Sequence, residues 1–264
     1  MADPSISRLF DLTGTTALVI GASSGIGARA ADVLARAGAD VAVAARRREQ
    51  LEAVAAGLRG HGRKACAFVL DAGERGASER CVAEVEATLG GVSLLVYASG
   101  VSRLGRAERH SPEKWDQALA VNLTGAFEAS QAVGRRLIER GEPGSIVHVG
   151  SVASLGANSV HRSVGYAASK AGLANLTRQL AIEWAPHGIR VNLLAPGYFA
   201  TDFTIDPRVG DIAPDQKAEI ERLTPLGRVG RLEELDTALA FLTSPASSYV
   251  TGTILTVDGG WTAW

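Results

Sequence analysis

Short β-branched runs alternate with longer amphipathic stretches along the whole chain. Each run has the length of a buried strand, and each stretch between runs has helical spacing. A strand–helix–strand series of this kind implies right-handed crossovers and a parallel sheet with helices on both faces. The expected strands are Thr15–Ile20, Asp40–Ala45, Lys64–Leu70, Val92–Ala98, Ser145–Gly150, Arg190–Ala195 and Thr253–Val257. The expected helices include Gly25–Gly38, Arg46–Gly60, Ala77–Gly90, Ser111–Gly141 and Val164–His187.

Composition excludes several other classes of protein. The 264 residues suit one large α/β domain, and 27 basic against 28 acidic residues argue against a nucleic-acid partner. No apolar run reaches the roughly 18 residues that a membrane span needs. The N-terminus lacks the basic residues followed by an apolar stretch that are typical of a signal peptide, so none is expected. Cys66 and Cys81 are too few for a disulfide framework, so we expect a cytoplasmic protein. The long irregular stretch from 198 to 225 is expected to form a lid.

A glycine-rich turn follows the first expected strand and opens directly into a helix. Its sequence is GASSGIG, from residue 21 to 27. Glycines let the backbone approach a pyrophosphate, whose charge then lies on the free N–H groups of the helix N-terminus. An ordinary tight turn is the alternative, but the position after the first strand favours a dinucleotide. The expected cofactor-binding residues of this turn are Gly21, Ser23, Ser24, Gly25, Ile26 and Gly27.

The end of the second expected strand indicates which dinucleotide binds. An NAD site has an acidic residue there for the ribose 2′-hydroxyl, whereas this chain has Arg46, Arg47 and Arg48. A guanidinium suits a 2′-phosphate, so NADP is favoured over NAD. The alternative is that Arg47 and Arg48 are a solvated first helical turn. Asp71, after the third strand, either reaches an adenine amino group or caps the following helix.

A second group of residues has the chemistry of an acid–base site. Tyr166 and Lys170 are four residues apart on an expected helix, and therefore lie on one face. A nearby ammonium lowers a tyrosine pKa from about 10 toward neutrality, so such a tyrosine can give or take a proton near pH 7. Ser151 lies at the end of the fifth strand, where parallel sheets bind ligands, and its hydroxyl could hold a carbonyl oxygen.

Taken together, the motifs resemble the classical short-chain dehydrogenase/reductase family over nearly the whole chain. The resemblance implies a doubly wound Rossmann fold of one domain with seven parallel strands, and hydride transfer between a nicotinamide and a small carbonyl or alcohol substrate. It also implies a homotetramer. Within the family the chain is most similar to gluconate 5-dehydrogenase-like and 3-oxoacyl-acyl-carrier-protein reductase-like members. The matching segments are Gly21–Gly27, Val121–Gly125, Gly150–Ser151, Tyr166 with Lys170, Arg190–Asn192, Pro196–Gly197 and Val257–Gly260.

The resemblance also implies a role for each site residue. Ser151 orients the substrate carbonyl, and Tyr166 is the proton donor or acceptor. Lys170 lowers the pKa of Tyr166 and binds the nicotinamide ribose, while Asn122 holds a water in the proton relay. Thr201 binds the nicotinamide carboxamide. The other cofactor-binding positions implied are Ala72, Ala98, Ser99, Gly100, Pro196, Gly197 and Phe199.

Three departures from the family pattern are visible. Ile20 stands where the family usually has threonine, and Tyr97-Ala98-Ser99-Gly100 stands where it usually has Asn-Asn-Ala-Gly. Since both changes fall at the same place in the fold, we expect an apolar contact between Ile20 and Tyr97 to replace a polar one. Ser151 and Tyr166 are fifteen residues apart, slightly more than is usual, which enlarges the loop around 158 to 163.

Further side chains near these motifs admit two interpretations. His148 is interpreted as a core residue with its hydrogen bonds satisfied. His161 and Arg162 either contact a polar or anionic substrate or are exposed, and Arg103 and Arg106 are interpreted as solvated rather than at a pocket mouth. Aromatic residues on the covering helices pack either in the core or between subunits, and those at the C-terminus pack near a second interface. These aromatic residues are Trp115, Phe127, Trp184, Trp261 and Trp264.

The sequence therefore favours an NADP-dependent oxidoreductase that interconverts a secondary alcohol and a ketone, with a preference for a polyol or sugar acid. A 3-oxoacyl-acyl-carrier-protein reductase is the alternative, but it needs a basic docking surface, for which only Arg135 and Arg136 qualify. A third hypothesis is a cofactor-binding sensor without turnover. The altered segment from Tyr97 to Gly100 motivates it, and the intact Ser151, Tyr166 and Lys170 weigh against it.

Overall fold

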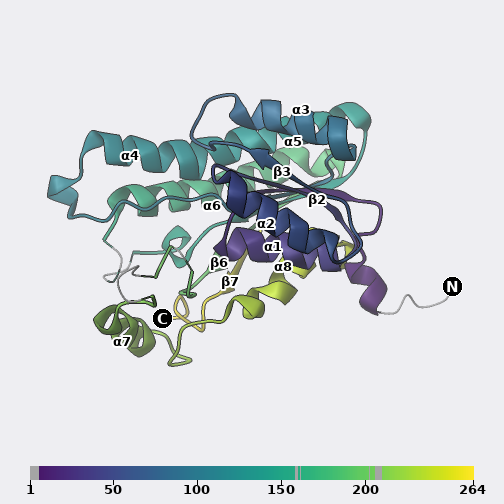
Figure 1. Cartoon of the computed structure of the whole chain (residues 1–264). Helices are drawn as coiled ribbons and strands as arrows, with labels where there is room; N and C mark the ends of the chain where they lie inside the picture. The colour runs from purple at the N-terminus through teal and green to yellow at the C-terminus, as the bar shows by residue number, and fades with distance from the viewer. Residues whose placement is uncertain (1–5, 158–159, 161, 202, 206–209) are drawn as a thin grey trace.

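The computed structural model describes residues 6–157, 160, 162–201, 203–205 and 210–264. They form a seven-stranded parallel sheet flanked by helices (Figure 1). The strand order is β3-β2-β1-β4-β5-β6-β7, so the predicted doubly wound fold class is confirmed. The strands are β1 (Thr16–Ile20), β2 (Asp40–Ala45), β3 (Ala65–Val69), β4 (Leu94–Tyr97), β5 (Gly144–Val149), β6 (Ile189–Pro196) and β7 (Ile254–Val257).

Helices cover both faces of the sheet (Figure 1). One core forms under α1 (Gly25–Arg36), α2 (Arg48–Arg59) and α8 (Asp236–Thr243). The other core forms under α3 (Ala77–Leu89), α5 (Gly125–Arg140) and α6 (Val164–Trp184), and α4 (Pro112–Leu119) packs against α6. Helix α7 (Pro214–Leu223) lies away from the sheet, among the segments that connect β6 to β7.

The central strands are largely apolar because both of their faces are buried. On β1, Ala17 and Val19 enter the core under α1, whereas Leu18 and Ile20 enter the core under α5. Successive strand residues point to opposite faces, so a strand covered on both sides needs a continuous apolar run rather than an alternating pattern. This explains why the strand runs could be read directly from the sequence.

Two stretches differ from the sequence-based expectation. The single helix expected from Ser111 to Gly141 is divided into α4, a π turn from Ala120 to Thr124, and α5. A π turn closes its hydrogen bonds five residues apart, and such turns are frequent at functional sites. The irregular lid expected from 198 to 225 contains α7, which begins at Pro214. Proline at a first helical turn is compatible with a helix because its missing N–H would have no partner there.

No helix in the described part of the chain combines the length and the apolarity that a membrane crossing requires.

Candidate active site

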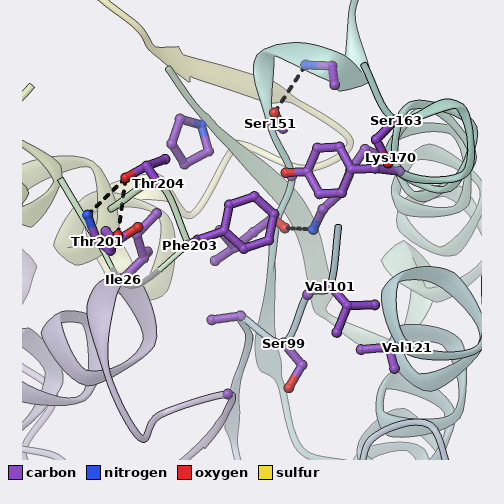
Figure 2. Close-up of a pocket in the computed structure, with 18 of the residues that line it drawn as sticks. Ile26, Ser99, Val101, Val121, Ser151, Ser163, Lys170, Thr201, Phe203 and Thr204 are labelled. Carbon is purple, nitrogen blue, oxygen red and sulfur yellow. Dashed lines mark hydrogen bonds between the residues drawn. The ribbon is translucent and has the colours of Figure 1, made fainter. Parts of the chain in front are cut away.

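A cavity of about 880 Å³ lies at the carboxyl ends of the strands, where ligands bind in parallel α/β sheets (Figure 2). It brings together residues that follow six different strands. All but one of the site residues predicted from the sequence line it; the exception, Asn122, is buried beside it. The predicted residues that line it are Gly21, Ser23, Ser24, Gly25, Ile26, Gly27, Arg46, Arg47, Asp71, Ala72, Ala98, Ser99, Gly100, Ser151, Tyr166, Lys170, Pro196, Gly197, Phe199 and Thr201.

Two glycines of the glycine-rich turn lie too close to neighbouring backbone atoms to carry a side chain. Gly21 has a φ of +89°, and a Cβ there would lie 2.5 Å from the backbone nitrogen of Ser99. A Cβ at Gly27 would lie 2.2 Å from the Gly21 carbonyl oxygen. Ser24, the N-cap of α1, makes no side-chain hydrogen bond to the first turn of that helix. The turn is therefore compact, and it presents the N-terminus of α1 to the cavity.

Arg47 crosses from the end of β2 to the glycine-rich turn. Its Nη2 donates to the Ser23 hydroxyl at 2.9 Å and to the Ser24 hydroxyl at 2.7 Å. Its Nε lies 3.2 Å from the same Ser23 oxygen. The alternative of a merely solvated Arg47 is thus wrong, whereas Arg48 is the exposed first residue of α2 and does not line the cavity.

Asp71 does not cap α3. That helix has Gly76 as its N-cap, and Asp71 instead accepts a hydrogen bond from the Gly73 backbone at 2.9 Å. The carboxylate shapes the turn after β3 and lines the cavity at the same time.

Ser151, Tyr166 and Lys170 meet at the opposite end of the cavity. Lys170 donates from Nζ to the Val149 carbonyl at 2.7 Å, and Nζ lies 5.8 Å from the centre of the Tyr166 ring. The Ser151 hydroxyl accepts from the Ala153 backbone at 3.1 Å, an interaction drawn as a dashed line in Figure 2. Ser151 also forms a side-chain hydrogen bond with Tyr166. The predicted acid–base group is therefore assembled from the end of β5 and one face of α6.

Burial dominates the electrostatics of this group. It raises the pKa of Tyr166 above its usual value of 10, and the hydrogen bond from Ser151 acts in the opposite direction. Burial also lowers the pKa of Lys170 to about 8. The expectation that Lys170 brings the Tyr166 pKa toward neutrality is therefore wrong for the cofactor-free chain. The physical reason is that the ammonium bonds the Val149 carbonyl and lies over the ring, 5.8 Å from its centre, while burial penalises the charged form of the phenol.

Asn122 lies in the π turn and joins two segments that border the cavity. Its Oδ1 accepts from the Val101 backbone at 2.8 Å, and its Nδ2 donates to the Val101 carbonyl at 3.0 Å. The same Nδ2 donates to the Ser169 hydroxyl at 2.9 Å, on the face of α6 between Tyr166 and Lys170. Asn122 thus fixes the loop after β4 against the helix that bears the acid–base residues.

The altered residues near β4 form a contact that is only partly apolar. Ile20 and Tyr97 are partners across the β1–β4 ladder and are buried in the same core, as expected. The Tyr97 hydroxyl, however, donates to the Val121 carbonyl in the π turn at 2.5 Å. The sequence did not indicate this bond because its acceptor is a backbone atom.

His148 is confirmed as a core residue. Its ring nitrogens lie 2.8 Å from the Thr177 hydroxyl and 2.8 Å from the Ser130 hydroxyl. Burial, with a smaller contribution from the Lys170 ammonium, lowers the pKa of His148 to about 3.

The substrate end of the cavity is lined by charged residues, two of which the sequence left with alternative interpretations. Arg106 and Arg162 border the cavity together with Glu108, so the interpretation of Arg106 as purely solvated is wrong. Arg103 instead donates to the Gln117 side chain at 2.7 Å. His161 lies outside the described residues. Phe203, which points into the cavity in Figure 2, has its ring 5.5 Å from that of Tyr166.

The segment that closes this end is fixed where it begins and ends. The Gly230 backbone donates to the Tyr198 carbonyl at 2.9 Å, and Phe199 forms an isolated parallel bridge with Gly230. The rings of Tyr198 and Trp261 lie 4.9 Å apart, so the C-terminal segment packs on the base of the same connection. The irregular composition of this stretch indicated a lid but not these contacts.

Aromatic residues of the covering helices divide into two kinds. Trp184 packs on α5, where a Cβ at Gly134 would lie 2.8 Å from its ring. Trp115 and Phe127 are each 38% exposed, and Trp264 at the C-terminus is 81% exposed. Within one chain, therefore, Trp184 and Trp261 are partly covered, whereas Trp115, Phe127 and Trp264 are exposed.

The chain is similar in sequence and in structure to known dehydrogenases and reductases. The family model described as enoyl-(acyl carrier protein) reductase matches residues 21–262. Galactitol 2-dehydrogenase (L-tagatose-forming) of Cereibacter sphaeroides is 41% identical over 97% of this chain and 98% of that protein. Gluconate 5-dehydrogenase of Gluconobacter oxydans is 40% identical over 96% of each chain. The crystal structure of a gluconate 5-dehydrogenase from Burkholderia cenocepacia in complex with NADP and tartrate superposes with a TM-score of 0.90 at 36% identity, covering 98% of this chain and 99% of that one.

Proposed function

Because the chain belongs to the classical short-chain dehydrogenase/reductase family, we propose that it interconverts a secondary alcohol and a ketone on a small polyol or sugar acid, with NADP as the cofactor. The observation that carries this proposal is the presence of Ser151, Tyr166 and Lys170 in one cavity with the glycine-rich turn. The substrate class is supported by the relatives named above and by the charged side chains of Arg106, Glu108 and Arg162 at the substrate end.

The cofactor end fits a dinucleotide phosphate. Gly21 and Gly27 have no room for a Cβ, and the turn that they belong to leads into a helix N-terminus, which attracts anions. From the end of β2, Arg47 already bonds the Ser23 and Ser24 hydroxyls of the glycine-rich turn, and a 2′-phosphate is a stronger acceptor for that guanidinium than either neutral oxygen. Arg46 and Arg47 would therefore hold the 2′-phosphate. When bound, the nicotinamide supplies or receives the hydride, and its oxidised form brings positive charge.

The chain's own residues supply the proton and hold the substrate. With its pKa raised by burial, Tyr166 is a protonated phenol at neutral pH and can donate to the oxygen of a ketone. Ser151 holds that oxygen beside the phenol. Oxidation of an alcohol needs the phenolate, and positive charge brought into the cavity would lower the pKa of Tyr166 in the direction that this requires. Lys170 is charged below about pH 8 and lies 5.8 Å from the centre of the Tyr166 ring.

The two competing functions are less well supported. Arg135 and Arg136, the candidate docking residues for an acidic carrier protein, bond to Glu79 at 2.6 and 2.7 Å, and Arg136 also pairs with Glu86 at 3.0 Å. Their charge is therefore largely balanced within the chain. The sensor hypothesis would leave the meeting of Ser151, Tyr166 and Lys170 in the same cavity as the glycine-rich turn without a use. A homotetramer stays a prediction.

Cofactor choice is tested by titrating the purified protein with NADPH and NADH and following fluorescence. We expect Arg47→Ala to weaken NADPH binding by about 10- to 100-fold, the value of one or two charge-assisted hydrogen bonds, and to leave NADH binding unchanged. Arg48→Ala is the matched control, since Arg48 does not line the cavity. Equal losses for both cofactors would refute the assignment of NADP.

Turnover is tested with NADPH on ketones, keto acids and β-ketoesters, and with NADP⁺ on polyols and sugar acids. We expect Tyr166→Phe to bind NADPH normally and to lose turnover, because it lacks the proton that Tyr166 transfers to the carbonyl oxygen. An active wild type with an equally active variant would overturn the role of Tyr166. Tight NADPH binding without turnover on any compound would favour the sensor.

A further inference from the structure

Tyr97 ends β4 with its side chain in the core under α5 and its hydroxyl at the π turn. The side chain is fully buried, and the hydroxyl donates to the Val121 carbonyl at 2.5 Å. Burial raises the pKa of this phenol, so it remains protonated and can only be a donor to that carbonyl. The residue before Asn122 is thereby attached directly to the sheet.

Space for this hydroxyl is provided by Gly125, the first residue of α5. A Cβ at Gly125 would lie 2.5 Å from the Tyr97 hydroxyl oxygen and 2.2 Å from the Ala72 carbonyl oxygen. The end of β4, the turn after β3 and the start of α5 therefore converge on one point, and only a glycine there lets the phenol reach the π turn. Val121, whose carbonyl accepts the bond, also lines the cavity near Val101 (Figure 2).

Asn122 carries the position of the π turn into the acid–base group. Its amide bonds Val101 and the Ser169 hydroxyl, and that hydroxyl donates to the Tyr166 carbonyl at 2.8 Å. A Cβ built on Gly100 would lie 3.6 Å from Asn122 Oδ1 and 3.7 Å from Lys170 Nζ, so these two atoms border the same small space. A shift of the π turn would move Asn122 and would therefore change the surroundings of Lys170.

We propose that Tyr97 is a positioning residue for the reaction, which holds through its hydroxyl the π turn that presents Asn122 to the face of α6 bearing Tyr166 and Lys170. The inference rests on the proposed function and adds to it a residue outside the cavity lining. It also assigns a function to Tyr97, which stands where the family usually has asparagine. The longer phenol side chain reaches from the strand to the π turn, which a shorter side chain would not.

The test is a double-mutant cycle in kcat with Tyr97→Phe, Asn122→Ala and the double variant. Tyr97→Phe removes one oxygen and keeps the ring that packs the core. We expect it to lower kcat by about tenfold, the usual effect of one lost buried hydrogen bond, and to leave the Kd for NADPH within about twofold. In the Asn122→Ala background we expect Tyr97→Phe to change kcat by less than about twofold, because both changes act through the same group. Tyr249→Phe, at a fully exposed tyrosine, is the control.

Hydrogen exchange of the free protein gives a second reading that needs no turnover. We expect Tyr97→Phe to speed exchange in peptides covering residues 119 to 126 and to leave β1 and β5 unchanged. Full multiplication of the two kcat effects, or unchanged exchange in the π turn, would overturn the positioning role. A wild type that turns over no compound would overturn the proposed function instead, and the exchange experiment would still decide whether Tyr97 holds the turn.

Discussion

Acid should destabilise this protein through His148, a buried histidine whose protonation is much less favourable in the core than in water. The ring is buried in β5 between the hydroxyls of Ser130 and Thr177. Its pKa in the folded chain is about 3, against an ordinary value of 6.5. The unfolded chain therefore binds a proton between these two values where the folded chain does not, and stability must fall as the pH falls through that window.

The size of the effect follows from the two pKa values. At pH 7.5 both states are neutral at this residue and the loss is close to zero. At pH 5 the unfolded state gains about 2 kcal/mol from protonation, and well below pH 3 the loss approaches about 5 kcal/mol. Other groups titrate over the same range, so only the part of the pH effect that disappears with His148 measures this contribution.

The assay is urea denaturation followed by circular dichroism at pH 7.5 and pH 5.0, at one protein concentration. We expect the free energy of unfolding of His148→Leu to fall by about 2 kcal/mol less between the two pH values than that of the wild type. The control, His187→Leu, removes an exposed histidine and should retain the wild-type difference. The same pH difference in wild type and His148→Leu would refute the reasoning.

Three further predictions concern the site and its support. Lys170, with a pKa of about 8, is charged below that pH, so kcat/KM for NADPH should fall about tenfold per pH unit above it, and a flat profile to pH 10 would contradict this. Gly21→Ala should destabilise the fold by more than about 2 kcal/mol in urea denaturation, because its Cβ meets Ser99; Gly14→Ala, with φ +84° and open space, should cost only about 1 kcal/mol, and equal losses would rule out the steric argument. Asp236→Asn, which loses charge-assisted bonds from Arg29 at 2.7 and 2.6 Å, should lower the free energy of unfolding by about 1 to 3 kcal/mol, a prediction that an unchanged urea midpoint would contradict.

Much of the sheet could be predicted from the sequence because strands that are buried on both faces consist of short apolar runs. The expected strand Thr15–Ile20 and the observed β1 (Thr16–Ile20) differ by one residue. The glycine-rich turn and the Tyr166–Lys170 spacing could also be recognised, because the residues that form each motif are only a few positions apart in the sequence. Local sequence patterns thus predicted both the arrangement of strands and helices and the residues at the two ends of the cavity.

What could not be predicted depends on contacts between distant segments. The π turn changes helical spacing over only five residues, too short a run for periodicity to show. The bond from Tyr97 ends on a backbone carbonyl 24 residues away, and no residue type marks such an acceptor. The pKa of Tyr166 was misjudged because spacing reveals a neighbouring charge but not the loss of water around a side chain.

The joined ends of the connection between β6 and β7 have a consequence for how this protein can diversify. Because the Gly230 backbone bonds the Tyr198 carbonyl and Phe199 bridges Gly230, the residues between them form a closed excursion from the sheet. Changing the length of such an excursion alters its closure entropy only slowly. This connection can therefore be exchanged between relatives without disturbing the sheet. A chimera that receives the corresponding segment of a relative would have a different lining at the substrate end of the cavity, while Tyr166, Lys170 and Ser151 keep their positions.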